Sequence, residues 1–134
     1  MFLRCREDRS LRRAGRHGLL SLSIVPVVVG GPVNAFTLWK PDAVRISIGA
    51  ENVGMYQKTP VSQRQYCKKC GGHLMTNHPP LDLVDVFAAT LPTLKFSPGV
   101  HVNYAETVLP MRDGLPKFKD FPAEFGGSGE QIAE

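Results

Sequence analysis

Apolar and polar residues alternate in short segments through the middle of the chain. Val44, Ile46 and Ile48 alternate with polar residues, and this segment ends at Gly49. A period of two residues is typical of a strand that buries one face. Similar reasoning predicts further strands at 53–57, 64–66, 74–76 and 100–105.

The apolar run Leu83–Ala89 fits either a buried strand or a short helix, and its β-branched and aromatic residues favour the strand. No segment shows helical periodicity over more than about two turns. The C-terminal region, from Pro110 to Gly127, is rich in proline and glycine, which excludes a long helix there. The pattern therefore predicts a mainly β protein.

Composition sets the size and the class of the protein. The chain has 134 residues, of which 43% are hydrophobic and 21% are charged, so one domain with a packed core is expected. Three cysteines are too few for the disulfide framework of a small secreted domain. We therefore expect a cytoplasmic protein whose cysteines bind metal or do redox chemistry.

The basic net charge of +4 comes from one end of the chain. The first 17 residues hold six arginines and two acidic residues, which leaves ten basic and ten acidic residues in 18–134. A nucleic-acid-binding domain spreads its basic residues over a folded face, so no nucleic-acid partner is predicted. The longest apolar stretch, Leu19–Val29, contains Pro26 and is shorter than the ~20 residues of a membrane span, so no membrane partner is predicted either.

The composition and the residue pattern of the sequence change at Gly30-Gly31-Pro32. Residues 1–29 form an atypical segment that is first Arg-rich and then apolar, whereas residues 30–134 resemble a compact β domain. An Arg-rich start followed by a short apolar run is also compatible with a targeting segment. N-terminal sequencing of the expressed protein tests that alternative.

The strongest chemical motif is Cys67-Lys68-Lys69-Cys70-Gly71-Gly72. A Cys-x-x-Cys turn places two thiolates on one tetrahedral zinc. The two glycines allow the backbone to curl and to direct N–H groups at sulfur, and the two lysines favour the thiolate form. Cys67 and Cys70 are therefore predicted to be metal ligands in a zinc knuckle between two strands.

Two other interpretations of the cysteine pair remain open. A redox dithiol normally begins a helix, which the two glycines disfavour, and an unligated pair in a turn becomes more plausible if further ligands are missing. The nearby candidates for the third and fourth ligand are His73, His78 and Cys5, and none of the three is well placed by sequence.

Other residues give weaker signals. A single histidine on a β domain, such as His101, is more often a hydrogen-bonded residue than a ligand. Asp113-Gly114 is typical of a turn, and Asp82 and Asp85 are not spaced as an acid–base pair. No catalytic residue is predicted.

Five segments of the chain match a known family in the correct order. They are Gly30–Phe36, Val44–Gly49, Tyr66–Leu74, His101–Glu106 and Asp113–Phe118. With these segments residues 30–134 resemble the family of glutathione-dependent formaldehyde-activating enzymes and centromere protein V. The resemblance implies an Mss4-like fold and a structural zinc, held by an early Cys-x-Cys together with the late Cys-x-x-Cys that Cys67 and Cys70 match.

The resemblance also implies a second cluster, Cys-x-Cys-x-x-Cys, shortly before Gly30, that binds a catalytic zinc or a glutathione thiol. This cluster and the early Cys-x-Cys are both absent from the chain. One hypothesis is that residues 1–29 are a wrong-frame translation, because an off-frame reading of codons for Ile24–Gly30 resembles the end of the cluster. Resequencing the locus tests it, and an intact upstream frame without the cluster ends it.

The sequence thus predicts a zinc-binding carbon–sulfur lyase-type protein that is impaired by loss of its catalytic cysteines. If active, it would act on a glutathione adduct or another small thiol-linked substrate. The alternative is a non-catalytic, zinc-stabilised β module that binds a protein partner. With two ligands in place, we expect the isolated chain to hold zinc weakly or not at all.

Overall fold

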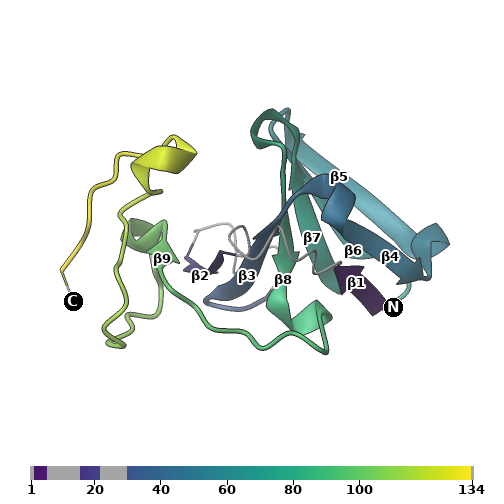
Figure 1. Cartoon of the computed structure of the whole chain (residues 1–134), viewed down its shortest axis with the longest axis horizontal. Coiled ribbons are helices and arrows are strands. Elements are labelled where there is room, and N and C mark those ends of the chain that lie inside the picture. The colour runs from purple at the N-terminus through teal and green to yellow at the C-terminus, as the bar shows by residue number, and fades with distance from the viewer. Residues whose placement is uncertain (1, 6–15, 22–29, 134) are drawn as a thin grey trace. The chain divides into compact units, whose positions relative to one another are not determined.

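The computed structural model describes residues 2–5, 16–21 and 30–133, and it is mainly β (Figure 1). The strands are β1 (Phe2–Cys5), β2 (His17–Leu20), β3 (Asn34–Trp39), β4 (Val44–Ile48), β5 (Val53–Thr59), β6 (Ser62–Cys67), β7 (His73–His78), β8 (Leu83–Phe87) and β9 (His101–Val102). The helical elements in these ranges are three-residue 3-10 turns at Pro41–Ala43, Ala50–Asn52, Pro79–Leu81, Ala88–Thr90, Tyr104–Glu106 and Ala123–Phe125. No helix in these ranges is long and apolar enough to cross a membrane.

Most of the predicted strands are present with shifted ends. The alternating segment forms β4, and the segments on either side of the cysteine motif extend into β6 and β7. The ambiguous run Leu83–Ala89 is a strand as far as Phe87, where a 3-10 turn begins.

The strand predicted at 100–105 is wrong beyond Val102. Asn103 takes a left-handed backbone conformation with a φ of 52°, which ends the extended strand and starts the 3-10 turn Tyr104–Glu106. Asparagine is among the few non-glycine residues that tolerate this conformation. Strand propensity gave no sign of this turn.

Seven strands are hydrogen-bonded in the order β5-β6-β7-β8-β3-β2-β9, and β1 pairs with β4 in a separate two-stranded sheet. The pairs from β5 to β8 are antiparallel, whereas β2 and β9 are parallel, so the larger sheet is mixed. The chain divides into two compact units. One combines Met1–Arg16 with Thr37–Phe96, and the other combines His17–Phe36 with Ser97–Glu134.

The first unit has an apolar core on the strands that flank the cysteine motif. Its buried members are Trp39, Ala43, Leu74, Met75, Val84, Val86 and Leu91. A buried polar link joins two of its strands, because the Thr37 hydroxyl donates to the Val86 carbonyl oxygen (3.0 Å) and accepts from the Trp39 indole (2.7 Å). The bonds satisfy polar groups that would otherwise be costly to bury.

The second unit contains short strands and long connections. The amide of His101 donates to the Pro116 carbonyl oxygen (2.8 Å), and the amide of Phe118 donates back to His101 (2.9 Å). Tyr104 and Phe118 are joined by a further backbone bond of 2.9 Å. These bonds hold the segment around Phe118 against β9 where regular strand pairing is short.

Of the atypical segment 1–29, the structure describes Phe2–Cys5 and residues 16–21. Leu19 and Ser21 donate backbone bonds to Val100 and Val102, which aligns β2 with β9. The apolar run 22–29, with the off-frame reading placed on it, lies outside the described residues.

Candidate functional site

The cysteine motif forms a tight turn between β6 and β7. The amide of Gly71 donates to the Cys67 carbonyl oxygen (2.7 Å), and the amide of Cys67 donates to the Gly72 carbonyl oxygen (2.8 Å). Gly71 has a φ of +74°, a left-handed conformation that glycine adopts without steric cost. The sequence therefore folds here as a closed strand–turn–strand unit, as predicted.

The backbone of the turn stabilises a thiolate at Cys67. The pKa of Cys67 lies below its ordinary value, chiefly because the Cys70 amide hydrogen-bonds the sulfur, followed by the Lys69 amide and the Cys70 thiol. Burial of Cys67 opposes this shift. Amide donors aimed at sulfur favour the deprotonated form that binds metal. The turn backbone thus favours the thiolate form of Cys67, and Lys69 and Cys70 supply the amides that do so.

The two sulfur atoms differ in accessibility. Cys67 is buried at the end of β6, whereas Cys70 is exposed at the tip of the turn. Neither cysteine is in a disulfide. The pair therefore presents one anchored sulfur and one sulfur open to an incoming ligand.

The two histidines nearest the turn, His73 and His78, contact other side chains. The ring of His73 stacks on Phe87 with centroids 4.6 Å apart, and Nδ1 of His78 lies 3.3 Å from the Ser62 hydroxyl. Burial, with a contribution from the positive charge of Arg64, lowers the pKa of His73 to about 4, so its ring is neutral at pH 7. Burial also lowers the pKa of His78.

Cys5, the third sulfur, belongs to β1, and its backbone pairs with Val44 of β4. Within the described residues, no group of three or more His, Cys, Asp or Glu side chains is arranged to hold a metal ion. The described residues therefore fit a tetrahedral zinc only in part, because Cys67 and Cys70 would supply two of the four ligands that such a metal requires.

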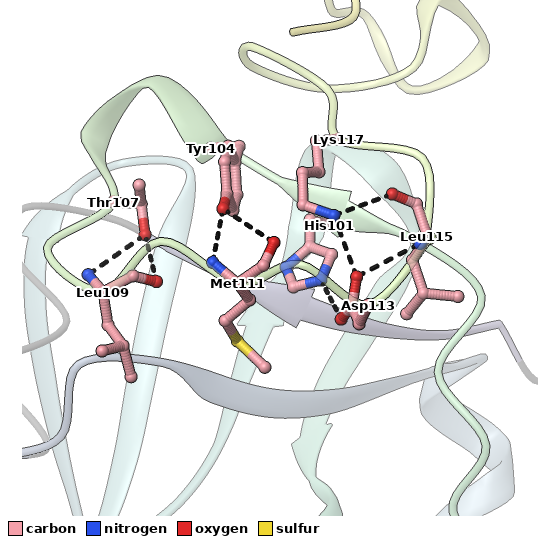
Figure 2. A network of polar contacts seen from close by, with 8 residues as sticks. All are labelled: His101, Tyr104, Thr107, Leu109, Met111, Asp113, Leu115 and Lys117. Atoms are coloured by element: carbon pink, nitrogen blue, oxygen red, sulfur yellow. Dashed lines mark hydrogen bonds and ion pairs between the residues drawn. The ribbon is translucent and has the colours of Figure 1, made fainter. Parts of the chain in front are cut away.

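A second candidate site is a buried charged network in the other unit (Figure 2). Nε2 of His101 lies 2.7 Å from Oδ2 of Asp113, and Nζ of Lys117 lies 2.9 Å from Oδ1 of the same carboxylate. The side chains of His101 and Lys117 are both 0% exposed. Lys117 also donates to the Leu115 carbonyl oxygen (3.1 Å), so its charge is paired and hydrogen-bonded.

Tyr104 extends this network. Its hydroxyl accepts from the Met111 amide (2.7 Å) and donates to the Met111 carbonyl oxygen (3.2 Å). Nζ of Lys117 lies 5.5 Å from the centre of the Tyr104 ring, within the range of a cation–π contact. Figure 2 shows the Tyr104 hydroxyl directed at the Met111 backbone and the side chains of His101 and Lys117 both directed at Asp113.

The geometry of His101 and Asp113 resembles that of a carboxylate orienting an imidazole base, yet its burial excludes this use in the described conformation. A general base must reach the proton that it removes, whereas His101 is fully buried and its Nδ1 has no hydrogen-bond partner. The Lys117 amine, and then His101, hold the pKa of Asp113 well below its usual range. The network therefore acts as a clamp between β9 and the loop from Asp113 to Lys117.

Sequence reasoning found parts of this clamp. It expected His101 to be a hydrogen-bonded residue and Asp113-Gly114 to be a turn, and both are confirmed: the Leu115 amide donates to Asp113 Oδ1 (3.1 Å) and Gly114 has a φ of +75°. It missed Lys117. A lysine four residues after an aspartate looks like an ordinary surface pair, so only the fold reveals its burial.

Asp82 and Asp85 are separate, as their spacing indicated. Asp82 pairs with Lys40 at 2.8 Å on the surface, whereas Asp85 is buried on β8 and its Oδ1 has no hydrogen-bond partner. Burial raises the pKa of Asp85 from 3.8 to about 7. A perturbed carboxyl can mark a functional site, but among the residues described here Asp85 belongs to no group of three or more His, Cys, Asp or Glu side chains that could hold a metal ion.

No family model matches the chain, and no curated protein matches it significantly. The resemblance to a family therefore rests on the five sequence segments alone.

Proposed function

We propose that the chain is a zinc-binding protein of the glutathione-dependent formaldehyde-activating family, with an Mss4-like domain in which Cys67 and Cys70 are one half of a structural zinc clamp. The observation that carries this proposal is the turn itself. Its amides at Lys69 and Cys70 donate to the Cys67 sulfur and favour its thiolate form. A bound zinc would supply a fixed tetrahedral centre that links its ligands and stabilises the domain.

Under the same proposal, the protein descends from carbon–sulfur lyases and has lost their catalytic activity. The family pattern implies a catalytic cluster of three cysteines before Gly30, and the whole chain has three cysteines, at 5, 67 and 70. Cys67 and Cys70 account for the structural pair, so one cysteine is left for the substrate site. We infer that a glutathione adduct, or another small thiol-linked substrate, is turned over slowly or not at all.

A second candidate function is a zinc-stabilised module that binds a protein partner in the cytoplasm. Strand β5 stands at one end of the strand order, and its Met55 and Tyr56 are 57% and 50% exposed. Val61, in the turn that follows β5, is 52% exposed. Exposed apolar residues on an edge strand favour contact with another protein.

Zinc binding is the direct test of the proposal. The purified, fully reduced protein is titrated with Co²⁺ and then with Zn²⁺, and thiolate-to-cobalt absorption is recorded. We expect absorption in the wild type, none in the double variant Cys67→Ser/Cys70→Ser, and wild-type absorption in the control Cys5→Ser. An unchanged spectrum in the double variant would contradict the assignment.

The predicted loss of catalytic activity is tested by an activity measurement. Exchange between glutathione, formaldehyde and their adduct is followed by NMR with and without the zinc-loaded protein. No acceleration above the spontaneous rate is expected from an impaired enzyme or from a binding module. A protein-dependent rate that survives Cys67→Ser/Cys70→Ser would place catalysis elsewhere in the chain and contradict the predicted impairment.

A further inference from the structure

The tip of the cysteine turn is open to a second molecule. Lys68, Lys69, Cys70, Gly71 and Gly72 are all exposed, whereas Cys67 is buried behind them at the end of β6. The turn is closed by its own backbone bonds, so its backbone shape is set before a metal binds. Two such turns can therefore meet tip to tip at a single ion.

The chain has few other residues to complete a thiolate-bound zinc. Its four histidines are at 17, 73, 78 and 101, and each has a different partner in the structure. His17 accepts from the Ser97 amide (3.1 Å), His73 stacks on Phe87, His78 contacts Ser62 and His101 is held by Asp113. Within the described residues no third His, Cys, Asp or Glu side chain is grouped with the cysteine pair, so the pair offers two ligands there where a structural zinc takes four.

We propose that two copies of this chain bind one Zn²⁺ ion between them, each copy contributing Cys67 and Cys70. This inference rests on the proposed zinc-binding role of the cysteine pair and names its partner as a second copy of the chain. Four thiols lose four protons on binding, and the resulting centre of four thiolates and one Zn²⁺ carries a charge of −2. Lys68 and Lys69 of each copy surround that charge with four positive groups, which offsets it.

The arrangement couples metal affinity to protein concentration. At low concentration a single turn holds zinc by two sulfur atoms and loses it readily. At high concentration the two sulfur atoms of a second copy take the two coordination positions that solvent fills in the single chain. The ion is then enclosed by four thiolates. Zinc therefore acts as the link that forms the dimer.

The test is the molar mass and the metal content of the full chain, measured together. The reduced protein is passed over a size-exclusion column with light-scattering detection, first with a chelator and then with added Zn²⁺, and the zinc in each peak is quantified. With the chelator, the expected molar mass is that of one chain. With added Zn²⁺, the expected molar mass is twice as high and each chain carries half a zinc ion. A chelator should return the dimer to monomer.

Two variants and two outcomes make the test decisive. Cys70→Ser should remain monomeric with zinc, Cys5→Ser should dimerise as the wild type does, and circular dichroism should show that both are folded. A monomer with one zinc per chain would overturn the shared site while leaving the zinc-binding role intact. A protein that takes up no zinc at any concentration would overturn both.

Discussion

Lys117 and Asp113 form a salt bridge of 2.9 Å in which the lysine side chain is fully buried. The same carboxylate lies 2.7 Å from His101, so one aspartate satisfies two buried nitrogen-bearing side chains. An ammonium group is expensive to remove from water, and the carboxylate compensates for that cost. The clamp therefore concentrates the stability of this part of the chain on a single residue.

Asp113→Asn should destabilise the protein strongly. The substitution removes the negative charge and leaves Lys117 buried without compensation, a change that typically costs ~3–5 kcal/mol. Urea unfolding at pH 7 measures the loss. Asp82→Asn is the matched control, because Asp82 pairs with Lys40 on the surface with its side chain 71% exposed, and we expect a change within ~0.5 kcal/mol. Equal effects of the two variants would contradict a buried clamp.

The pH dependence of stability should contain a contribution from Asp85. Its folded pKa of about 7 exceeds the ordinary 3.8, so between these values the folded chain keeps a proton that the unfolded chain releases. The stabilisation is complete below about pH 4, falls as the pH rises toward 7 and is flat above, a loss of up to roughly 4 kcal/mol. Asp85→Asn should abolish this slope relative to the wild type in urea unfolding from pH 4 to 8. Parallel curves for the two proteins would refute it.

His73 should contribute to the pH dependence of stability with the opposite sign. Its folded pKa is about 4 against an ordinary 6.5, so the unfolded chain binds a proton that the folded chain excludes. The stabilisation is complete above about pH 6.5 and is lost as the pH falls toward 4, by roughly 2 kcal/mol after allowing for its partial exposure. His73→Gln should lack this loss on the acid side. Since His73 and Asp85 titrate in overlapping ranges, each variant is compared with the wild type at the same pH.

Gly71→Ala should weaken both folding and metal binding. A φ of +74° costs a residue with a side chain roughly 1–2 kcal/mol, although the space around the added carbon is open. Gly31→Ala is the control, because Gly31 also has no close neighbour and does not have a positive φ. We expect thermal unfolding to separate the two variants and cobalt titration to show weaker binding only for Gly71→Ala. Similar unfolding temperatures would mean that the turn tolerates strain.

Local sequence signals identified the elements that depend on neighbouring residues. The period of two in Val44–Ile48 predicted a strand, and the structure has one there. The glycines after Cys70 predicted a closed turn, which backbone hydrogen bonds form. Both features depend on the backbone preferences of a few adjacent residues. The end of the strand at Val102 was not predictable in this way, because asparagine also occurs in strands and the residues beside Asn103 do not mark its left-handed conformation.

The predicted ligands of the cysteine pair show the limit of the sequence. Sequence distance left His73 and His78 open as candidates, and the fold turns one onto Phe87 and the other toward Ser62. Neither contact is visible without β7, because the strand fixes the face on which each side chain points. The scarcity of further ligands was already evident from three cysteines in the whole chain.

The sequence by itself determined the β character of this protein, the position of the cysteine turn and the departure from the family's cysteine pattern, since each follows from residue types and short spacings. Only the tertiary structure decided that Lys117 is buried, that Asp113 joins it to His101 and that Oδ1 of Asp85 is buried without a hydrogen-bond partner. These facts depend on how the rest of the chain packs around each residue, which short spacings do not encode. Burial, which turns an ordinary charged residue into a costly one, is a property of that packing.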